Sequence, residues 1–578
     1  MRRPNPKAPK PRWILQPQPD AADLDTFSDY PPQLATLLWQ RGFRNAEKIG
    51  RFLSPSFRER SDPRKLSDMR KAVARLRRAL SEHERLFVVG DLDHDGICGA
   101  VLLVTFLEDL GLRAKAYIPS ETEGHDVSAR AIALAKKSGA ALLFTVDFGV
   151  SSHEAIRGAR QQSIDVVILD HHALPQTPPA AAALVDPRQD KDAGALANLC
   201  GAGVAFAFVD ACLREGLVPK RAENREQYLH AFLDLVAMAT VGDLVPLVGD
   251  NRLFVQGGLL ALAERKRPGT KALLRVAGIL GSIGEDDVAF SLVPRLNAAS
   301  RVGNASLAYQ LLTAKKMAVA QTYAKRIDRA NRERQTTAKH LFQEATEKIE
   351  GEREIPWVIV VGDVSWPMGY LPVVVSRLRD RYHRPVFVWG GHPDGFVRMS
   401  ARSLPALNLV EAMRACGGTA LFRKFGGHPQ AAGADLDAAK LSEFAQCIKQ
   451  RGSALLSRED LVPRVEIDLE LGAKELSPEL ARSFEPLAPF GKGNPRPRIV
   501  VHNLEVSSVF APRRSFFGAV AFVPAEGGKT LRTFVEKDHP ALQFRAGDVV
   551  DVVFEYVRLF GMSSDKTPLP VLVDAHLH

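Results

Sequence analysis

The segment VVGDLDHDG, residues 88–96, is the most informative part of the sequence. It starts inside an apolar run, RLFVVG (85–90), which predicts a β-strand, and continues with Asp91, Asp93 and Asp95 at alternate positions. Carboxylates this close repel one another and resist the loss of their hydration. A bound divalent cation would relieve that conflict, since Mg²⁺ and Mn²⁺ prefer oxygen ligands. Taken alone, the motif also fits a solvated acidic turn.

The flanking sequence predicts a parallel α/β sheet. Short apolar runs alternate with helical patterns, which is typical of a sheet covered by helices on both faces. A more helical segment follows to about residue 310. The predicted strands after the first are RAKAYI (113–118), ALLFTV (141–146) and DVVILD (165–170), and helices are expected at 97–111, 127–138 and 152–162.

Two of these strands also end in metal-binding residue types. ALLFTV is followed by Asp147, and VVILDHH (166–172) ends in Asp170, His171 and His172. The carboxyl ends of parallel strands meet at one edge of a sheet, where ligands bind. Asp243, in TVGDLVPL (240–247), is a further candidate ligand, although a helix cap is the alternative. Together these groups predict a two-metal site that hydrolyses a phosphoester or phosphoanhydride.

The rest of the chain predicts a connecting helix and two further domains. Residues 315–350 lack proline and glycine and carry nine Lys/Arg against five Asp/Glu, so we expect one long exposed helix. Its charge fits either a solvated face or a basic bridge that lines a channel for a polyanion. A second α/β block begins near residue 355. The last ~115 residues hold six β-like segments and predict a small antiparallel barrel.

Composition sets the broad class. The 578 residues are 46% hydrophobic and carry a net charge of +10, which indicates roughly three to four globular domains and excludes a disordered chain. No apolar run is long enough to span a membrane. The basic start, MRRPNPKAPKPRWIL, predicts a loose cationic arm rather than a secretory signal. Five cysteines without a CxxC pair argue against a disulfide framework or a cysteine zinc site, and favour a reducing cytoplasm.

At this point the residues resemble a known family. The triplet DHH (170–172), with GDLDHDG, TVD and GDLVPL, is similar to the DHH phosphoesterase superfamily and, within it, to the RecJ family. The similarity continues in LCGAGVAF (199–206), PRLNAASR (294–301), SRL (376–378), SARS (400–403), FGGHPQAAG (425–433) and FGKGNPRP (490–497). It implies a basic arm and lead-in (1–45), a parallel-sheet DHH domain (46–310), a long connecting helix (311–352), a smaller α/β DHHA1 domain (353–455) and an OB-like β-barrel (456–578).

The resemblance also implies roles for individual residues. The metal ligands would be Asp93, Asp95, Asp147 as the bridging group, His171 and Asp243, and Asp91, Asp170 and His172 would act in catalysis. The DNA backbone or its 5′ end would be held by Arg301, Ser376, Arg377, Arg402, Gly426, Gly427 and His428. In the barrel, RRSFF supplies a candidate nucleic-acid patch of Arg513, Arg514, Phe516 and Phe517.

The implied activity is that of a 5′→3′ exonuclease specific for single-stranded DNA. It would use two Mn²⁺ or Mg²⁺ ions, release 5′-mononucleotides and serve DNA repair and recombination in the cytoplasm. A RecQ-type helicase and a single-strand-binding protein are expected partners, and no membrane is. The alternatives are a divergent nuclease for RNA or short oligonucleotides and a non-catalytic scaffold. The chain departs from the family pattern on the substrate side, at His94, Phe148, Ser300, Pro367 and Met399.

Overall fold

The computed structural model describes residues 10–120, 123–124, 126–301, 305–392, 394–512, 517–524, 530–537, 539–558 and 568–578. The chain forms two compact units. We call Glu47–Arg332 together with Pro486–Arg496 the parallel-sheet unit. Met1–Ala46, Glu333–Glu485 and Pro497–His578 make up the mixed-sheet unit. No described helix is long and apolar enough to cross a membrane.

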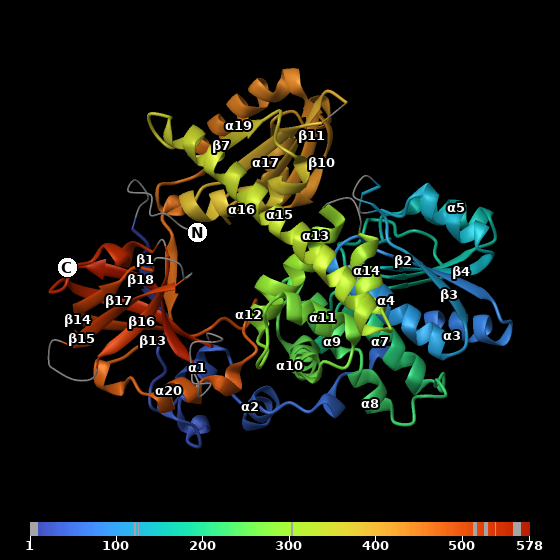
Figure 1. Ribbon diagram of the computed structural model, residues 1–578, viewed down its shortest axis with the longest axis horizontal. Coiled ribbons are helices and arrows are strands. Elements are labelled where there is room, and N and C mark those ends of the chain that lie inside the picture. The colour runs from blue at the N-terminus through green and yellow to red at the C-terminus, as the bar shows by residue number, and fades with distance from the viewer. Residues whose placement is uncertain are drawn as a thin grey trace. The chain divides into compact units, whose positions relative to one another are not determined.

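The parallel-sheet unit is built on the predicted sheet. Five parallel strands lie in the order β3-β2-β4-β5-β6. Figure 1 labels β2, β3 and β4 of this sheet. The bounds of the five strands are β2 (Arg85–Gly90), β3 (Arg113–Tyr117), β4 (Ala140–Val146), β5 (Asp165–Leu169) and β6 (Ala183–Val185). The helices α4 (His94–Asp109), α5 (Ala129–Lys137) and α6 (His153–Gln161) connect them, and α3 (Met69–Ser81) and α7 (Gly201–Arg214) complete the two helical layers.

Alternate residues of each strand fill two separate cores. Val88 and Phe144 belong to the core under α3, α4 and α7, whereas Val89 and Leu143 belong to the core under α5 and α6. Both faces of the sheet are therefore covered, which explains why the strands read as continuous apolar runs. Full burial of each large side chain removes it from water and stabilises the fold by about 1.5–3 kcal/mol.

Helices complete the parallel-sheet unit. A π-helical turn (Val288–Leu292) leads directly into α13. Near the start of the unit, the buried guanidinium of Arg60 contacts Asp210 and Glu226. The helices are α2 (Ala46–Leu53), α8 (Arg225–His230), α9 (Leu233–Gly242), α10 (Gly249–Glu264), α11 (Pro268–Val276), α12 (Glu285–Asp287), α13 (Val293–Arg301) and α14 (Ser306–Thr313).

The long helix expected from the sequence is α15 (Met317–Glu350). Its 34 residues correspond to about 51 Å of continuous helix at 1.5 Å per residue. Apolar side chains recur three or four residues apart at both ends: Ala320, Ala324 and Ile327 are buried near the start, and Leu341, Ala345 and Ile349 near the end. Most charged residues lie on the remaining surface of the helix, but Asp328 is buried and pairs with Arg295 at 3.0 Å.

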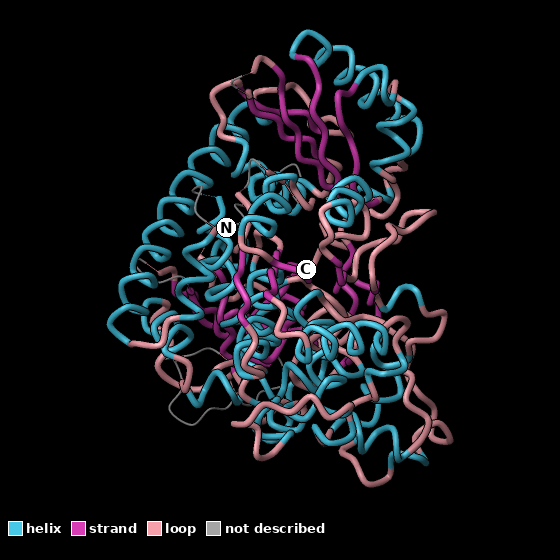
Figure 2. Tube along the Cα trace, turned by 90° about the vertical axis from the view of Figure 1, so that its right-hand side faces the viewer, coloured by secondary structure: helices cyan, strands magenta, loops and turns pink. Residues whose placement is uncertain are grey.

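The second α/β block forms a mixed five-stranded sheet in the order β10-β11-β9-β8-β7. Only β7 and β8 are parallel neighbours. Figure 2 shows these strands in magenta at the top of the view, lying against helices. The strands are β7 (Ile359–Asp363), β8 (Val386–Gly391), β9 (Phe396–Arg402), β10 (Phe422–His428) and β11 (Ala431–Asp437), and the helices are α16 (Leu371–Tyr382), α17 (Leu409–Ala415), α18 (Gly418–Leu421) and α19 (Leu441–Leu455).

One covalent link corrects the prediction made from the cysteine count. Cys416, at the end of α17, and Cys447, on α19, form a disulfide. The other three cysteines are buried and free. The prediction failed because the two cysteines are 31 residues apart and meet only when α17 and α19 pack together.

The C-terminal strands form the predicted barrel. β14 (Arg498–Phe510) pairs with both β15 (Phe517–Pro524) and β17 (Val549–Val557), and the ring closes through β16 (Leu531–Glu536) and β18 (Leu569–Leu577). Most pairs are antiparallel, but β16 pairs with β18 in parallel. The short strand β13 (Leu469–Glu470) joins one edge through β14, and α20 (Pro478–Ser483) precedes β14.

The N-terminal arm is not loose where the structure describes it. Residues Arg12–Leu15 form β1, which pairs in parallel with β12 (Arg464–Ile467). The Trp13 indole donates to Asp574 Oδ2 at 2.8 Å and stacks on His576 at 3.9 Å between ring centroids. The helix α1 (Pro32–Gln40) follows. The arm was misread because its strand partner lies about 450 residues away, as Arg12 opposite Arg464 shows.

Candidate metal centre

The turn between β2 and α4 places the first carboxylates. The backbone N–H of Asp91 donates to the carbonyl of Val146 at 3.1 Å, which ties the turn to the end of β4. Asp93 Oδ1 accepts from the backbone N–H groups of Asp95 (2.8 Å) and Gly96 (3.3 Å), so Asp93 caps α4. A Cβ at position 96 would overlap the backbone of Asp91, and glycine is therefore required there.

Asp95 is fully buried and is held by a second helix. Its two carboxylate oxygens accept from the backbone N–H groups of Gly201 and Ala202, each at 2.7 Å, in the first turn of α7. Burial and repulsion from Asp93 nevertheless raise the pKa of Asp95. Gly201 is needed for a second reason, because a Cβ there would overlap Asp147. The segment LCGAGVAF thus positions two of the predicted ligands.

Asp147 and His171 face each other across the centre of the site. Asp147 follows β4 in a left-handed conformation with a φ of 71° and is 3% exposed. Its Oδ1 lies 3.1 Å from His171 Nε2, and neither buried atom is hydrogen-bonded to a residue that the structure describes. Burial and repulsion from Asp95 raise the pKa of Asp147 well above its usual value, and burial lowers the pKa of His171.

Asp170 and His172 form a pair beside this centre. Asp170 is buried, and its Oδ1 accepts from His172 Nδ1 at 2.8 Å while Oδ2 accepts from the backbone N–H of Val150 at 3.1 Å. The bond to Asp170 raises the pKa of His172 to about 9. Burial opposes ionisation of Asp170, but these hydrogen bonds outweigh it and lower the pKa of Asp170. His172 is half-exposed, with 48% of its side chain accessible.

Asp243 closes the site from the C-terminal end of α9. Its Oδ2 lies 3.7 Å from His171 Nε2. Burial and repulsion from Asp95 raise the pKa of Asp243 to about 6. The structure confirms the helix-cap position that the sequence allowed, but it also brings the carboxylate to the other acids. The cap position is confirmed, and the role of Asp243 as a metal ligand stays a prediction.

The grouped side chains fit divalent cations. Three overlapping sets bring potential ligand atoms within 4.8 Å of one another: Asp91, Asp93 and Asp147; Asp95, His171 and Asp243; Asp147, His171 and His172. Five carboxylates and two imidazoles match the oxygen and nitrogen donors that Mn²⁺ accepts. The unpaired buried atoms of Asp147 and His171 are those that an ion would satisfy. The acidic-turn alternative is wrong, because three of these carboxylates are buried: Asp91, Asp95 and Asp147.

The predicted substrate-binding residues of the mixed-sheet unit meet only in part. Arg402 on β9 and His428 on β10 both pair with Ala431 of β11, so they lie on one rung of the sheet. Gly426 and Gly427 precede His428 on the same strand, and a Cβ at Gly427 would overlap the carbonyl of Ala431. Ser376 and Arg377 lie on α16 instead, where the Ser376 hydroxyl donates to the carbonyl of Pro372 at 2.9 Å.

Several predicted residues are not placed. Arg301 ends α13, but its side chain lies outside the described residues, as do Arg513, Arg514 and Phe516. Phe517 begins β15 and is half-buried. Two departures from the family pattern, Phe148 and Met399, are buried in hydrophobic cores. Ser300 is buried with its hydroxyl on the carbonyl of Asn297 at 3.0 Å, and Pro367 precedes the turn that leads into α16.

Sequence reasoning missed two supports of the site. Asn297 Oδ1 accepts from the backbone N–H of His94 at 2.9 Å, at the start of α4. The segment 486–496 packs on the loop after Asp243, where the N–H of Leu247 donates to the carbonyl of Lys492 at 2.7 Å. Arg252 anchors that segment by donating to the carbonyl of Leu487 at 2.8 Å. The motifs PRLNAASR and FGKGNPRP were visible, but their partners are distant in sequence.

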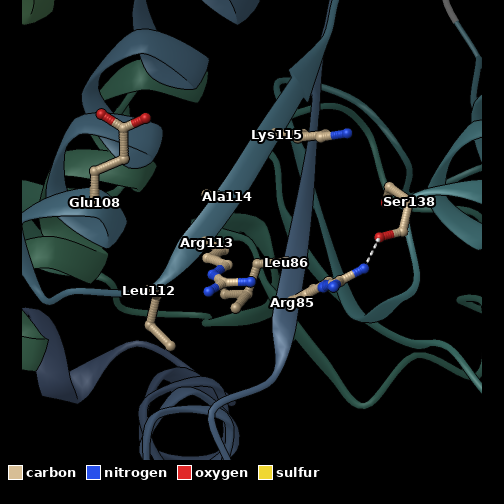
Figure 3. A pocket seen from close by; sticks show the side chains of 8 residues that line it. All are labelled: Arg85, Leu86, Glu108, Leu112, Arg113, Ala114, Lys115 and Ser138. Atoms are coloured by element: carbon tan, nitrogen blue, oxygen red, sulfur yellow. Dashed lines mark hydrogen bonds between the residues drawn. The ribbon is translucent and has the colours of Figure 1, made fainter.

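A cavity of about 470 Å³ lies at the other end of the sheet and is separate from the metal centre. Figure 3 shows Arg85, Arg113 and Lys115 beside it, at the start of β2 and on β3, with Arg85 donating to the carbonyl of Ser138 at 3.4 Å. The candidate ligands follow the carboxyl ends of the strands, where open α/β sheets bind ligands. The chemistry is therefore expected at the opposite edge from this cavity.

Comparison with known proteins agrees with this architecture. Sequence models of three families match in order: the DHH family N-terminal domain at residues 85–240, the DHHA1 domain at 355–453 and the RecJ OB domain at 467–556. A solved structure of RecJ from Thermus thermophilus in complex with Mn²⁺ superposes with a TM-score of 0.82 at 27% identity, covering 98% of this chain and 80% of that one. A further structure, exonuclease RecJ bound to manganese, covers 68% of this chain and 98% of its own, with a TM-score of 0.58 at 31% identity.

Curated relatives are named single-stranded-DNA-specific exonuclease RecJ. The protein from Bacillus subtilis (strain 168) is 33% identical over 508 residues, which cover 87% of this chain but 63% of the relative. The protein from Dickeya dadantii (strain 3937) is 34% identical over 82% of this chain and 84% of its own length. With this identity over most of both sequences and all three family domains in order, the chain belongs to the RecJ family of metal-dependent exonucleases.

Proposed function

We propose that this protein is a single-stranded-DNA-specific exonuclease that removes 5′-mononucleotides from the 5′ end with two divalent ions. The observation that carries the proposal is the convergence of seven ligand-type side chains from the ends of β2, β4, β5 and α9. The names of the relatives described above state that they are exonucleases specific for single-stranded DNA. A non-catalytic scaffold would not need to retain every one of these groups.

In this proposal Asp93, Asp95, Asp147, His171 and Asp243 would hold the ions. When bound, two such ions activate a water and stabilise the attacking and leaving oxygens of an in-line displacement. Asp95 is already oriented by the two N–H groups of α7, so it needs little rearrangement to bind. Burial keeps His171 neutral, which is the form that binds a metal.

Asp170, His172 and Asp91 would act on the substrate beside the ions. Asp170 holds the imidazole of His172 through Nδ1, so Nε2 is the ring nitrogen left for a phosphate oxygen. Because its pKa is raised to about 9, His172 carries positive charge at neutral pH and suits a phosphate oxygen. Asp91, 4% exposed beside the same group, would orient the ligands or the water.

The mixed-sheet unit would hold the strand. Arg402 and His428 on one rung, with the close backbone approach at Gly426 and Gly427, suit a phosphate or the 5′ end. We assign Arg301, Ser376 and Arg377 to the same task. Arg513, Arg514, Phe516 and Phe517 would contact the strand at the barrel. A cytoplasmic role in repair and recombination, with a RecQ-type helicase and a single-strand-binding protein, is part of the same proposal.

Release of label from a 5′-labelled single strand in Mn²⁺ tests the proposal. A 3′-labelled strand, a blunt duplex and an RNA of the same sequence serve as comparisons. Asp147→Asn is expected to abolish release, whereas Asp165→Asn, at the amino end of β5 and away from the ions, is the matched control with retained activity. Cleavage of RNA alone would establish the RNA alternative. A lack of cleavage with intact strand binding would establish the scaffold.

A further inference from the structure

An exposed aromatic ring stands on the helix that supports the metal centre. Phe290 is 75% exposed, within the π-helical turn Val288–Leu292. Val288 and Leu292 on either side of it are fully buried, so the turn is anchored while Phe290 points away from the core. Short π-helical turns are often found at functional sites.

Its position connects it to the ligands. Phe290 lies in the π-turn that leads into α13, seven residues before Asn297. Asn297 Oδ1 accepts from the backbone N–H of His94, between Asp93 and Asp95. The same helix packs on the Asp243 side, where Val293 lies against Gly242. Seven residues of helix correspond to about 10 Å along the axis, which sets the scale of the separation between Phe290 and Asn297.

The residues next to Phe290 form an acidic turn. Glu285, Asp286 and Asp287 directly precede the π-turn, and Arg496 pairs with the first two at 2.6 and 2.9 Å, which leaves net negative charge. The Arg496 guanidinium also lies over the Phe490 ring, 5.3 Å from its centroid. This turn would repel the phosphates of a strand that passes Phe290, so a base rather than a phosphate would face the ring.

We propose that Phe290 stacks on a nucleobase of the substrate strand near its 5′ end and so sets the position of the scissile phosphate at the metal centre. This rests on the proposed function and names a positioning residue for it. Single-strand binders use exposed aromatic rings in this way because every base has a π-face, which makes the contact independent of sequence. The side chain of Phe290 can bind a ligand only through its apolar ring, and the bases are the apolar surfaces of a single strand.

The test compares Phe290→Ala and Phe290→Trp with the wild type on intact strands and on strands that carry one abasic residue at successive positions from the 5′ end. Leu280→Ala is the matched control, since Leu280 is 77% exposed in the same unit. Phe290→Ala is expected to raise the KM at least about five-fold, the lower end of what one base stack provides, with a smaller effect on kcat. Phe290→Trp and Leu280→Ala are expected to stay near the wild type.

The abasic strands give a readout that a purely structural role would not move. One abasic position should raise the KM of the wild type and leave that of Phe290→Ala unchanged, because the stack is already lost. Binding of the same strands by fluorescence anisotropy in EDTA separates the contact from hydrolysis. Equal affinity of the wild type and Phe290→Ala for the intact strand would overturn the inference. If the wild type binds the strand through Phe290 but releases no nucleotide, the proposed function is wrong and the inferred contact still holds.

Discussion

The imidazole of His94 lies against Gly242, and a Cβ added at Gly242 would overlap its Nε2 atom. His94 is 3% exposed and opens α4 between two candidate ligands, Asp93 and Asp95. Gly242 is the last residue of α9 and directly precedes Asp243. The two ends of the metal centre are therefore fitted to each other through a histidine and a glycine, and the size of one residue limits the size of the other.

Gly242→Ala is expected to lower Mn²⁺ affinity and activity by at least about ten-fold, because the new methyl group displaces the end of α9 or the start of α4. The double variant His94→Ala/Gly242→Ala should recover most of the loss, since removal of the imidazole leaves room for the methyl group. Calorimetric titration with Mn²⁺ and single-strand hydrolysis would measure both. A double variant no better than Gly242→Ala would contradict the coupling.

Asp147→Asn is expected to stabilise the metal-free protein while it abolishes metal binding. The carboxylate is buried near Asp95, Asp93 and Asp91, so its neutral isostere relieves repulsion that only an ion would otherwise offset. The expected gain in the free energy of unfolding is on the order of 1–3 kcal/mol in EDTA. Urea denaturation would measure it.

Asp210→Asn is the matched control for that experiment, with the opposite sign. Asp210 is equally buried, but it accepts from Arg60 Nε at 3.0 Å and Arg214 Nε at 3.1 Å. Replacement by asparagine leaves the buried Arg60 with one fewer negative partner and should lower the free energy of unfolding by about 3 kcal/mol. Destabilisation of similar size in both variants would show that repulsion at Asp147 is not important for the metal-free protein.

Asp186→Asn is expected to change how stability depends on pH. Asp186 is fully buried after β6, and burial raises its pKa to about 7 from 3.8. The folded state keeps this proton up to about pH 7, whereas the unfolded chain releases it near pH 3.8. The free energy of unfolding therefore decreases as the pH rises from 3.8 to about 7. The amide of the variant does not titrate and so removes that loss. At pH 8 the free energy of unfolding of the variant should exceed that of the wild type by roughly 2 kcal/mol or more. Urea denaturation at pH 5 and 8 would check it, and an identical difference at both would refute it.

Mn²⁺ is expected to raise the melting temperature of the wild type and to leave that of Asp147→Asn nearly unchanged. An ion that binds only the folded state at 100 times its dissociation constant adds about 2.7 kcal/mol to the free energy of unfolding. Removal with EDTA should return the wild type to its starting value. Equal melting temperatures in EDTA and in saturating Mn²⁺ would mean that the clustered carboxylates do not hold an ion.

Local pattern was enough to predict the strands and much of the candidate site. Apolar runs such as those ending at Gly90 and Val146 specify strands, and parallel strands deliver the residues after them to one edge. Asp91, Asp147 and His171 could therefore be grouped without coordinates. The long helix α15 was predicted from a segment without proline or glycine. The barrel strands were predicted from short apolar segments separated by glycine, proline and charged residues.

Contacts between distant segments could not be predicted in this way. Asp95 is held by Gly201 and Ala202, more than one hundred residues later, and β1 finds its partner at the far end of the chain. The same holds for the disulfide between Cys416 and Cys447. Each of these contacts depends on how whole helices and strands pack together, so the residues near each partner in the sequence do not predict it.

The type of chemistry could be inferred from short motifs, because each predicted strand is followed directly by carboxylates or histidines and parallel strands end at one edge of the sheet. How those groups are held could be seen only in the folded chain: which backbone N–H groups orient Asp95, why position 242 must be glycine and that Phe290 is exposed to solvent. The physical reason is that periodicity acts over a few residues, whereas close packing is settled between surfaces that meet only after the chain has folded.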